Sequence, residues 1–295
     1  MALMPFDDRD GSIWINGEMI PWREATSHTL SHGLHYASTV FEGERVYSGV
    51  IFKGREHTER LRRSCEMLDF ELPLSDDELD TAKMAVVEAN GIVDGYVRAF
   101  AWRGSEMMAI SAQHTTTHVA IAAWEWPSYF DPETKMKGIT LDIADWKRPS
   151  PESAPVHAKA AGLYMICTLS KHAAEKKGFQ DALMLDYRGY LAEATGANVF
   201  FVDKEGTIHT PIADCFLDGI TRRTVIALAE SLQMKVVQRH LTLDDLSEMT
   251  ECFLTGTAAE VTPVSQIGDA SFTPGDISRQ LVNGYENLVR GRIAL

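Results

Sequence analysis

The predicted fold depends first on the stretch His157-Ala158-Lys159-Ala160-Ala161-Gly162-Leu163-Tyr164, which sets a lysine among alanines and a glycine. Further along, Leu191-Ala192-Glu193-Ala194-Thr195-Gly196-Ala197-Asn198 opens a tight polar turn with a glutamate. A lysine amine is nucleophilic only when neutral, and apolar surroundings favour that state. The small neighbours leave room for a flat ring to lie against the backbone. A carboxylate aimed at a pyridine nitrogen keeps that nitrogen protonated, which makes the ring an electron sink.

Lys159 and Glu193 together therefore suggest pyridoxal phosphate held as a Schiff base. Taken singly, each motif has a plainer explanation. A lysine flanked by alanines is usually a solvated helix residue, and a lone Glu-x-x-Gly is usually a turn. Candidate phosphate-binding motifs further on, in the expected order, favour the cofactor.

The first of these motifs is Asp218-Gly219-Ile220-Thr221-Arg222-Arg223, which opens a predicted helix after a loop. Unpaired N–H groups and the helix dipole suit a phosphate dianion, with the Thr221 hydroxyl as a further donor. The alternative is that Asp218 simply caps the helix. Downstream, Leu254-Thr255-Gly256-Thr257-Ala258-Ala259-Glu260 follows a predicted strand and could present a second anion-binding turn. No Gly-Lys-Ser/Thr follows, so it is not a Walker loop.

Composition limits the possible partners. The chain has 295 residues, of which 45% are hydrophobic and 24% are charged, as in ordinary globular proteins. Its 28 basic and 42 acidic side chains leave a net charge of −14. Nucleic acid and anionic membranes are therefore disfavoured as partners. An acidic protein must bind an anionic cofactor through local positive sites, such as arginines and helix N-termini.

The cysteines and the N-terminal residues indicate a cytoplasmic protein. Four cysteines lie far apart without a Cys-x-x-Cys, so neither a metal site nor a disulfide framework is expected, and buried reduced thiols are predicted. The first residues lack the basic and apolar regions of a signal peptide, and no apolar run approaches the length of a membrane span. We expect a soluble cytoplasmic protein.

Hydrophobic periodicity predicts a two-domain chain. Residues 125–138, rich in proline, aromatic and charged residues, are the predicted linker between a domain over 1–124 and one over 139–295. In the first predicted domain the expected elements are a hairpin at 13–20 turned at Asn16-Gly17, strands at 39–47 and 50–52, a helix over 56–68, a helix from a Ser75–Glu78 capping box to about 90, and strands at 96–102 and 117–124. In the second they are a strand at 139–144, a helix over 159–176, a meander of three strands over 182–210, a helix over 221–232, strands at 235–238 and 251–255, and a helix over 277–292.

In this order the motifs resemble the class IV (fold-type IV) pyridoxal-phosphate aminotransferases, and within them the branched-chain amino-acid aminotransferases. The resemblance runs from about Ile13 to Val264. Its carriers are Ser31-His32-Gly33-Leu34-His35-Tyr36, Val40-Phe41-Glu42-Gly43, Glu56-His57-Thr58-Glu59-Arg60-Leu61, Ala158 to Tyr164, Glu193 to Asn198, Gly219-Ile220-Thr221-Arg222 and Gly256-Thr257-Ala258-Ala259-Glu260. It implies an α+β fold with a small N-terminal α/β domain and a larger C-terminal pseudobarrel domain that binds the cofactor.

The resemblance assigns roles to individual residues. Lys159 would form the Schiff base and move the proton between Cα and C4′, and no metal is implied. Glu193 would pair with the pyridine nitrogen and Tyr164 with the ring's phenolate oxygen. Leu217 would pack on one face of the ring. The phosphate and its surroundings would be bound by Arg60, Gly219, Ile220, Thr221, Gly256 and Thr257. Outside this set of motifs, Arg60 would be read as a solvated helix arginine.

The substrate pocket follows from the same correspondence. Its residues would be Tyr36, Phe41, Tyr96, Arg98, Met108, Trp126, Tyr129, Thr257 and Ala258. Strand alternation puts Tyr96 and Arg98 on one side, which suits joint binding of a carboxylate, although a Tyr/Arg pair on an exposed sheet face would look the same. Trp126 and Tyr129 could equally be plain packing. Departures from the family pattern, which leave the pocket size open, are Ala37, Ala99, Met107, Ala109, Ala161 and Ala197.

The implied activity is transamination of L-leucine, L-isoleucine and L-valine with 2-oxoglutarate, giving branched-chain 2-oxo acids and L-glutamate. The resemblance also implies a homodimer, in which the loop around Met107-Met108 reaches the partner's site. Two alternatives stay open. One is another class IV enzyme: a D-amino-acid or (R)-amine aminotransferase, or an aminodeoxychorismate lyase. The other is a catalytically silent binding protein that kept the fold, against which an intact Lys159 argues.

Overall fold

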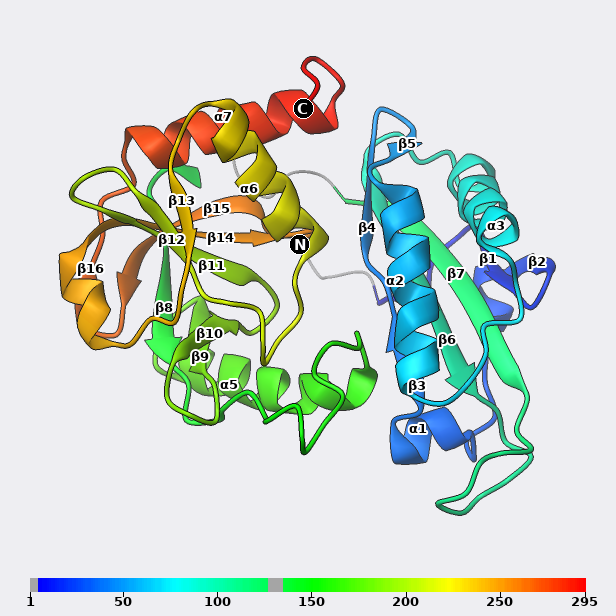
Figure 1. Ribbon diagram of the computed structural model, residues 1–295. Helices are drawn as coiled ribbons and strands as arrows, with labels where there is room; N and C mark the ends of the chain where they lie inside the picture. The colour runs from blue at the N-terminus through cyan, green and yellow to red at the C-terminus, as the bar shows by residue number, and fades with distance from the viewer. Residues whose placement is uncertain (1–4, 127–134) are drawn as a thin grey trace. The chain divides into compact units, whose positions relative to one another are not determined.

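A computed structural model describes residues 5–126 and 135–295, and the chain divides into two compact units (Figure 1). Unit 1 is Met1–Pro127 with Ala158–Gly162, and unit 2 is Ser128–His157 with Leu163–Leu295. The predicted linker at 125–138 falls mostly outside the described residues.

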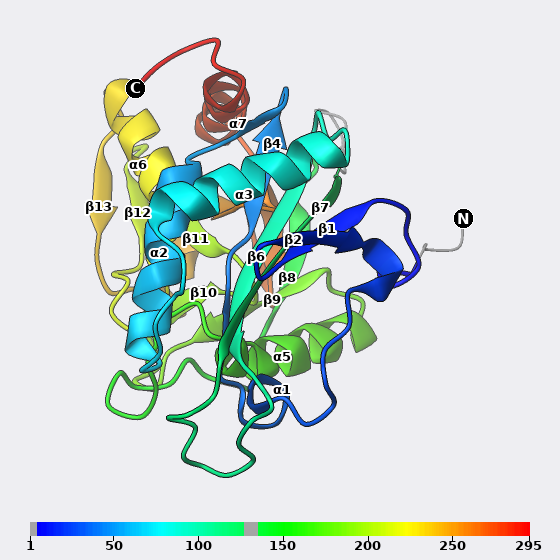
Figure 2. The same cartoon turned by 90° about the vertical axis from the view of Figure 1, so that its right-hand side faces the viewer.

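Among the described residues, unit 1 forms a seven-stranded antiparallel sheet in the order β2-β1-β7-β6-β4-β5, with β3 paired to β6 (Figure 2). Its strands are β1 (Ser12–Ile15), β2 (Glu18–Pro21), β3 (Thr39–Phe41), β4 (Glu44–Tyr47), β5 (Val50–Ile51), β6 (Gly95–Arg103) and β7 (Thr117–Glu125). The Asn16-Gly17 turn of the first hairpin is confirmed, since both residues adopt the positive φ that such a turn needs. The short helix α1 (His32–Tyr36) precedes β3.

Helices α2 (Gly54–Met67) and α3 (Asp76–Ala89) contact each other and the sheet of unit 1. The α2 helix buries Leu61 and Cys65, as its spacing predicts. The α3 helix begins at the predicted capping box: the Glu78 backbone N–H donates to Ser75 Oγ, and Glu78 Oε2 accepts from the Ser75 backbone N–H. These reciprocal bonds satisfy donors that a helix start would otherwise leave unpaired.

Unit 2 is built on a closed barrel. In the part of the chain that the structure describes, six strands run in the order β10-β9-β8-β15-β14-β11, and β10 also pairs with β11, which closes the ring. The strands are β8 (Ile139–Ile143), β9 (Asp181–Leu185), β10 (Leu191–Ala194), β11 (Asn198–Asp203), β14 (Met249–Gly256) and β15 (Glu260–Ile267); β12 (Ile208–Thr210), β13 (Val236–Gln238) and β16 (Ala270–Ser271) extend the sheet. The predicted α+β fold with a C-terminal pseudobarrel is confirmed.

All six strands contribute side chains to the barrel core, among them Leu141, Leu183, Leu191, Val199, Leu254 and Val264. Because side chains alternate along a strand, the neighbours of these residues face outward. Helices α6 (Ile220–Ser231) and α7 (Asp276–Val289) contact β14 on this outer side, and α5 (Met165–Lys176) contacts β8 and β9 (Figure 1). Phe200 and Phe253 stack there with ring centroids 5.0 Å apart.

Several observed elements differ from the predicted ones. The single strand expected over 39–47 is divided into β3 and β4. The helix expected over 159–176 begins only at Met165, after a 3₁₀ turn over Ala161–Tyr164. The meander expected to hold three strands holds four, because its three turns separate β9, β10, β11 and β12. No strand is predicted over 260–267, a stretch that contains Pro263, yet β15 pairs with β14 and β8.

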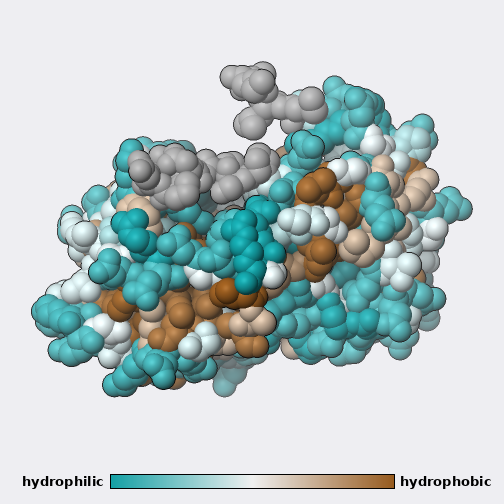
Figure 3. All heavy atoms as spheres, turned by 90° about the horizontal axis from the view of Figure 1, so that it is seen from above, coloured by the Kyte–Doolittle hydropathy of each residue, from teal (hydrophilic) through white to brown (hydrophobic). Residues whose placement is uncertain are grey.

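The visible surface is mainly hydrophilic. Hydrophilic residues cover most of the face in Figure 3, with hydrophobic residues between them. Within the described ranges, no helix is both long and apolar enough to cross a membrane. All four cysteines are buried, as predicted.

Candidate functional site

Lys159 lies in unit 1, in an extended segment beside β3. Its backbone N–H donates to Ser64 Oγ at 3.0 Å, and its carbonyl accepts from the Phe41 N–H at 3.1 Å. The neighbouring Ala160 forms a β-bridge with Val40. These contacts explain why the predicted helix fails here: tertiary pairing holds the backbone extended. The half-buried side chain places Nζ 4.9 Å from the centre of the Phe41 ring.

Several residues expected around the substrate gather near this lysine in unit 1. The Arg98 guanidinium lies 4.5 Å from the Phe41 ring centre and 5.6 Å from that of Tyr96. Tyr96 and Arg98 therefore share one side of β6, as the alternation predicts. Tyr96 also packs against Trp126, at 5.4 Å between ring centroids. The result is an aromatic wall with a cation lying against it.

Gly43 makes room for this wall. A Cβ built on Gly43 would lie 1.8 Å from the Tyr96 hydroxyl oxygen, far inside van der Waals contact. Only glycine lets the Tyr96 hydroxyl approach the backbone so closely.

The predicted phosphate ligand Arg60 belongs to a buried ionic cluster. Its Nε and Nη2 donate to the Glu42 carboxylate at 2.7 and 2.8 Å, and Glu42 Oε2 also lies 2.6 Å from His57 Nδ1. Burial alone would raise the pKa of Glu42, but the charges and hydrogen bonds of Arg60 and His57 outweigh it and hold that pKa well below its ordinary value. Arg60 is thus a buried, oriented cation, and not the solvated helix arginine of the alternative reading.

Two further residues expected around the substrate belong to other parts of unit 1, and a third falls outside the described chain. Tyr36 lies on α1, where its ring stacks on His32 at 4.6 Å between centroids. Met108 is 43% exposed, and its neighbour Ala109 is bound through its carbonyl to His32 Nε2 at 2.9 Å. Tyr129 lies outside the described residues.

In unit 2, Glu193 stands at the end of a row of polar side chains. Glu193 pairs across the sheet with Asn198, and Asn198 pairs with Thr255 on β14. Residues directly opposite each other in antiparallel strands project from the same face, so all three side chains face away from the barrel core. Thr255 Oγ1 is buried and has no hydrogen-bond partner within residues 5–126 and 135–295.

Both oxygens of Glu193 have neighbours that hold the carboxylate. Asn198 Nδ2 donates to Glu193 Oε2 at 3.3 Å, and Arg148 Nε lies 3.4 Å from Oε1. The buried Arg148 also donates to the Leu163 carbonyl at 3.3 Å, next to Tyr164. Tyr164 itself is half-buried at the start of α5.

The predicted anion-binding helix start is present in α6. Gly219 is its N-cap, and no side chain in the described part of the chain caps it. The Asp218 carboxylate accepts a hydrogen bond from Arg222 Nη1 at 2.7 Å, so the capping role considered for Asp218 is not what the structure contains. Ile220 and Thr221 form the first turn and are buried. The first N–H groups of α6 are therefore available to an anion.

The remaining predicted cofactor-binding residues flank this helix start and the end of β14. The Leu217 carbonyl accepts from Asn198 Nδ2 at 3.0 Å. Gly256 ends β14, and the turn of Thr257 and Ala258 leads into β15, with Thr257 half-buried and Ala258 exposed. Asn198 thus links Glu193 to the segment before α6, and its sheet pairing links both to β14.

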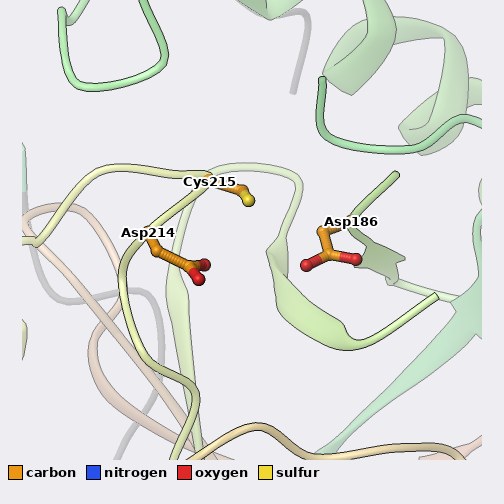
Figure 4. A group of neighbouring side chains, drawn as sticks. All are labelled: Asp186, Asp214 and Cys215. Atoms are coloured by element: carbon orange, nitrogen blue, oxygen red, sulfur yellow. The ribbon is translucent and has the colours of Figure 1, made fainter. Parts of the chain in front are cut away.

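A second cluster in unit 2 has the spacing of metal ligands (Figure 4). Asp186 follows β9, Asp214 and Cys215 precede α6, and their ligand atoms lie within 4.8 Å of one another. Arg188 Nη2 donates to Asp186 at 2.6 Å, to Asp214 at 2.8 Å and to Cys215 Sγ at 3.3 Å. Burial, with the Asp214 charge, raises the pKa of the Cys215 thiol to about 12. The guanidinium takes the place a cation would need, and the cluster ties the β9–β10 turn to the segment before α6.

Sequence reasoning missed the side chains that hold the predicted residues in place. Glu42 and Asn198 lie within the family motifs, which assign them no role, and no motif contains Arg148 or Arg188. For Asn198 a signal existed: a glutamate and an asparagine on either side of a tight turn become a cross-strand pair. Arg148 offers no such signal, because it lies 45 residues from Glu193 in sequence and only the fold joins them.

Comparison with known proteins places this geometry in a family. A family model described as amino-transferase class IV matches residues 39–267. A Rickettsia felis protein named probable branched-chain-amino-acid aminotransferase is 43% identical over 294 residues, which are 98% of this chain and 100% of the relative. The structure of a T.th. branched-chain amino acid aminotransferase with pyridoxamine 5'-phosphate superposes with a TM-score of 0.93 at 38% identity, covering 97% of this chain and 96% of that one. The same T.th. enzyme complexed with N-(5'-phosphopyridoxyl)-L-glutamate gives a TM-score of 0.92 at 37% identity, with the same coverage. With the matched family model spanning most of its length, the chain belongs to the class IV aminotransferases.

Proposed function

We propose that this protein is a pyridoxal-phosphate-dependent aminotransferase that moves the amino group of L-leucine, L-isoleucine or L-valine to 2-oxoglutarate. The observation that carries the proposal is in unit 2, where a fixed carboxylate, Glu193, is joined through Asn198 to the segment that opens the uncapped helix α6. Family membership and relatives that are named branched-chain enzymes support it.

The residues present fit this cofactor. A protonated ring nitrogen needs an anion, and Glu193 is held as one between Arg148 and Asn198. A phosphate needs several donors, and the N–H groups of α6 with the Thr221 hydroxyl supply them. The buried Thr255 hydroxyl, without a partner among the described residues, is a further polar group on the same barrel face. The donor set therefore matches a ring with an anion-seeking nitrogen and a phosphate.

Bound pyridoxal phosphate supplies an electron sink for the charge that develops when the substrate Cα loses its proton. Lys159 Nζ would hold the cofactor's aldehyde and then take and return the proton at Cα. Glu193 would keep the proton on the ring nitrogen. Tyr164 would donate to the ring oxygen, and Leu217 would pack against the ring face. Arg60, Gly219, Ile220, Thr221, Gly256 and Thr257 would bind the phosphate and its surroundings.

The substrate side of the proposal rests on unit 1. Phe41, Tyr96 and Trp126 provide apolar surface for a branched side chain, and Arg98 provides a cation for a carboxylate. Both are needed, because leucine and glutamate occupy the same site in turn. Tyr36, Met108, Tyr129, Thr257 and Ala258 complete the proposed pocket. The T.th. enzyme's complex with a phosphopyridoxyl glutamate supports glutamate as one partner.

We further propose that the protein is a cytoplasmic homodimer. The exposed Met108 and Ile110, at 43% and 84%, lie in a segment that His32 and Arg103 hold through the carbonyls of Ala109 and Ala112. A fixed loop with exposed apolar tips suits contact with a second copy. Light scattering of the purified protein should give twice the mass of the chain.

The domain boundaries, at 124 and 139, stay a prediction.

The assignment can be tested on Lys159 directly. Purified protein should show a visible absorption band from bound cofactor, and borohydride reduction followed by peptide mass spectrometry should find the reduced cofactor on Lys159. The Lys159→Ala variant should stay soluble, lose the label and lose turnover. Lys176→Ala, an exposed lysine at the end of α5, is the matched control and should keep all three.

A panel of amino donors then decides the substrate. With 2-oxoglutarate as acceptor, L-leucine, L-isoleucine and L-valine should be turned over fastest. Much faster conversion of D-alanine or (R)-1-phenylethylamine would assign the protein to another branch of class IV. Absence of bound cofactor would favour a silent binding protein, and wild-type rates in Lys159→Ala would contradict the assignment of that lysine.

A further inference from the structure

Asn198 occupies the point where three segments of unit 2 meet. Its backbone pairs with Glu193 on β10 and with Thr255 on β14, the strand that ends at Gly256. Its side chain reaches the Leu217 carbonyl, two residues before the N-cap of α6. The residue is 5% exposed. Each of the three segments carries residues proposed to bind the cofactor, and Asn198 is not itself one of them.

The chemistry of its neighbours fixes the orientation of the Asn198 amide. Nδ2 lies 3.3 Å from Glu193 Oε2 and 3.0 Å from the Leu217 carbonyl oxygen, and a carboxylate and a carbonyl can only accept hydrogen bonds. The NH₂ group must therefore face both of them. The oxygen faces Gly219, where a Cβ would lie 2.2 Å from Oδ1, so the close approach requires glycine at the N-cap.

We propose that Asn198 is a positioning residue for the reaction: its single NH₂ group holds the Glu193 carboxylate and the Leu217–Gly219 segment in one fixed arrangement. The inference rests on the proposed function, since it assumes that Glu193 faces the ring nitrogen and that α6 binds the phosphate. The proposed function assigns Asn198 itself no contact with the ring nitrogen or with the phosphate. Its contribution is to make the anion and the helix start a single preorganised unit, so that the cofactor does not have to order them on binding.

The contact with Glu193 is accompanied by another on that side chain: Asn198 Nδ2 lies at Oε2, while Arg148 Nε lies near Oε1. The carboxylate is held at both oxygens, which removes rotation about its last bond. The change Asn198→Asp would keep nearly the same shape. It would replace the NH₂ group by a carboxylate oxygen, which accepts hydrogen bonds only and would face the Glu193 carboxylate and the Leu217 carbonyl.

The test compares cofactor binding to the apoprotein of three variants. Asn198→Asp reverses the hydrogen-bonding polarity and should weaken the Kd for pyridoxal phosphate about 100-fold, while Asn198→Ala should weaken it about 10-fold. Asn90→Ala is the matched control in unit 1: Asn90 also bridges backbone groups, with Nδ2 donating to the Ser12 and Val86 carbonyls, and its variant should bind the cofactor like wild type. Circular dichroism and thermal melts of each apoprotein establish that it is folded. If apo Asn198→Ala is unfolded, Asn198→Asp carries the comparison.

A double-mutant cycle separates positioning from a merely structural role. The fold-loss in affinity that Asn198→Ala causes should be at least about threefold smaller in a Glu193→Ala background than in wild type, because the amide then has only the Leu217 carbonyl to hold. Equal losses in both backgrounds would overturn the inference, as would folded Asn198 variants that bind the cofactor like wild type. If wild-type protein itself binds no pyridoxal phosphate, the proposed function fails first, and this outcome is distinct from the other two.

Discussion

Replacing Glu42 with glutamine should destabilise unit 1 by about 3 kcal/mol at neutral pH. Glu42 is 1% exposed and accepts two hydrogen bonds from Arg60, which is itself 9% exposed, and a third contact from His57. Glutamine keeps the size of the side chain and one acceptor oxygen. It cannot neutralise Arg60, which is left as a buried cation without its counter-ion.

The magnitude follows from what remains after the change. Removing one partner of a buried ion pair generally costs about 3–5 kcal/mol, because the surviving charge has lost both its partner and water. The lower end applies here, since the amide oxygen that Glu42→Gln leaves in place of a carboxylate oxygen can still accept from Arg60. The same change should weaken cofactor binding, because Arg60 loses the carboxylate that orients its guanidinium.

The dependence on pH gives a second prediction from the same variant. Glu42 ionises more readily in the folded than in the unfolded protein, so its folded-state pKa lies below the unfolded value of about 4.3. Its contribution to stability is therefore complete above about pH 4.3 and is lost as the pH falls toward the folded-state pKa. The stability difference between wild type and Glu42→Gln should be full at pH 7 and shrink as the pH is lowered below about 4.3.

Urea unfolding followed by tryptophan fluorescence measures this difference. Five of the six tryptophans, Trp14, Trp22, Trp102, Trp124 and Trp126, lie in unit 1, so the signal reports mainly on the unit that contains Glu42. The control is Glu59→Gln on α2, which removes the same charge from a half-exposed pair with Arg63 and should cost less than about 0.5 kcal/mol. A loss below about 1 kcal/mol for Glu42→Gln, or one independent of pH, would refute the reasoning.

Three further changes test other parts of the structure. Glu193→Gln should lower kcat about 100-fold in steady-state assays while changing cofactor affinity less, because the ring nitrogen loses its anionic partner; unchanged kinetics would remove Glu193 from the site. Gly43→Ala should raise the KM for branched-chain substrates, since its Cβ would displace the Tyr96 hydroxyl, and an unaltered KM would mean that Tyr96 does not line the pocket. Arg188→Met should lower the thermal midpoint of the apoprotein, because it leaves the carboxylates of Asp186 and Asp214 without their cation; a rise in the midpoint would show that the cluster is not a stabilising contact.

The elements that the sequence predicts well depend on residues close together in the chain. The Asn16-Gly17 turn needs positive φ at adjacent residues, and the capping box needs Ser75 and Glu78 three residues apart. The helix predicted over 221–232 is observed as α6 over Ile220–Ser231, so its start differs by one residue. Such patterns act within a few residues, so local sequence specifies them without reference to the rest of the fold.

For the site, the sequence by itself indicated which residues the proposed chemistry would use: a lysine among small neighbours, a glutamate that opens a tight turn, and a helix start suited to an anion. It did not determine how they are held. Pairing with β3 overrides the helical pattern around Lys159, and closure of β10 onto β11 places Glu193 beside Asn198 and within reach of Arg148. These contacts join residues far apart in the chain, and their energies depend on burial and on charge pairing. Both quantities exist only once the chain has folded, which is why the tertiary structure alone decided them.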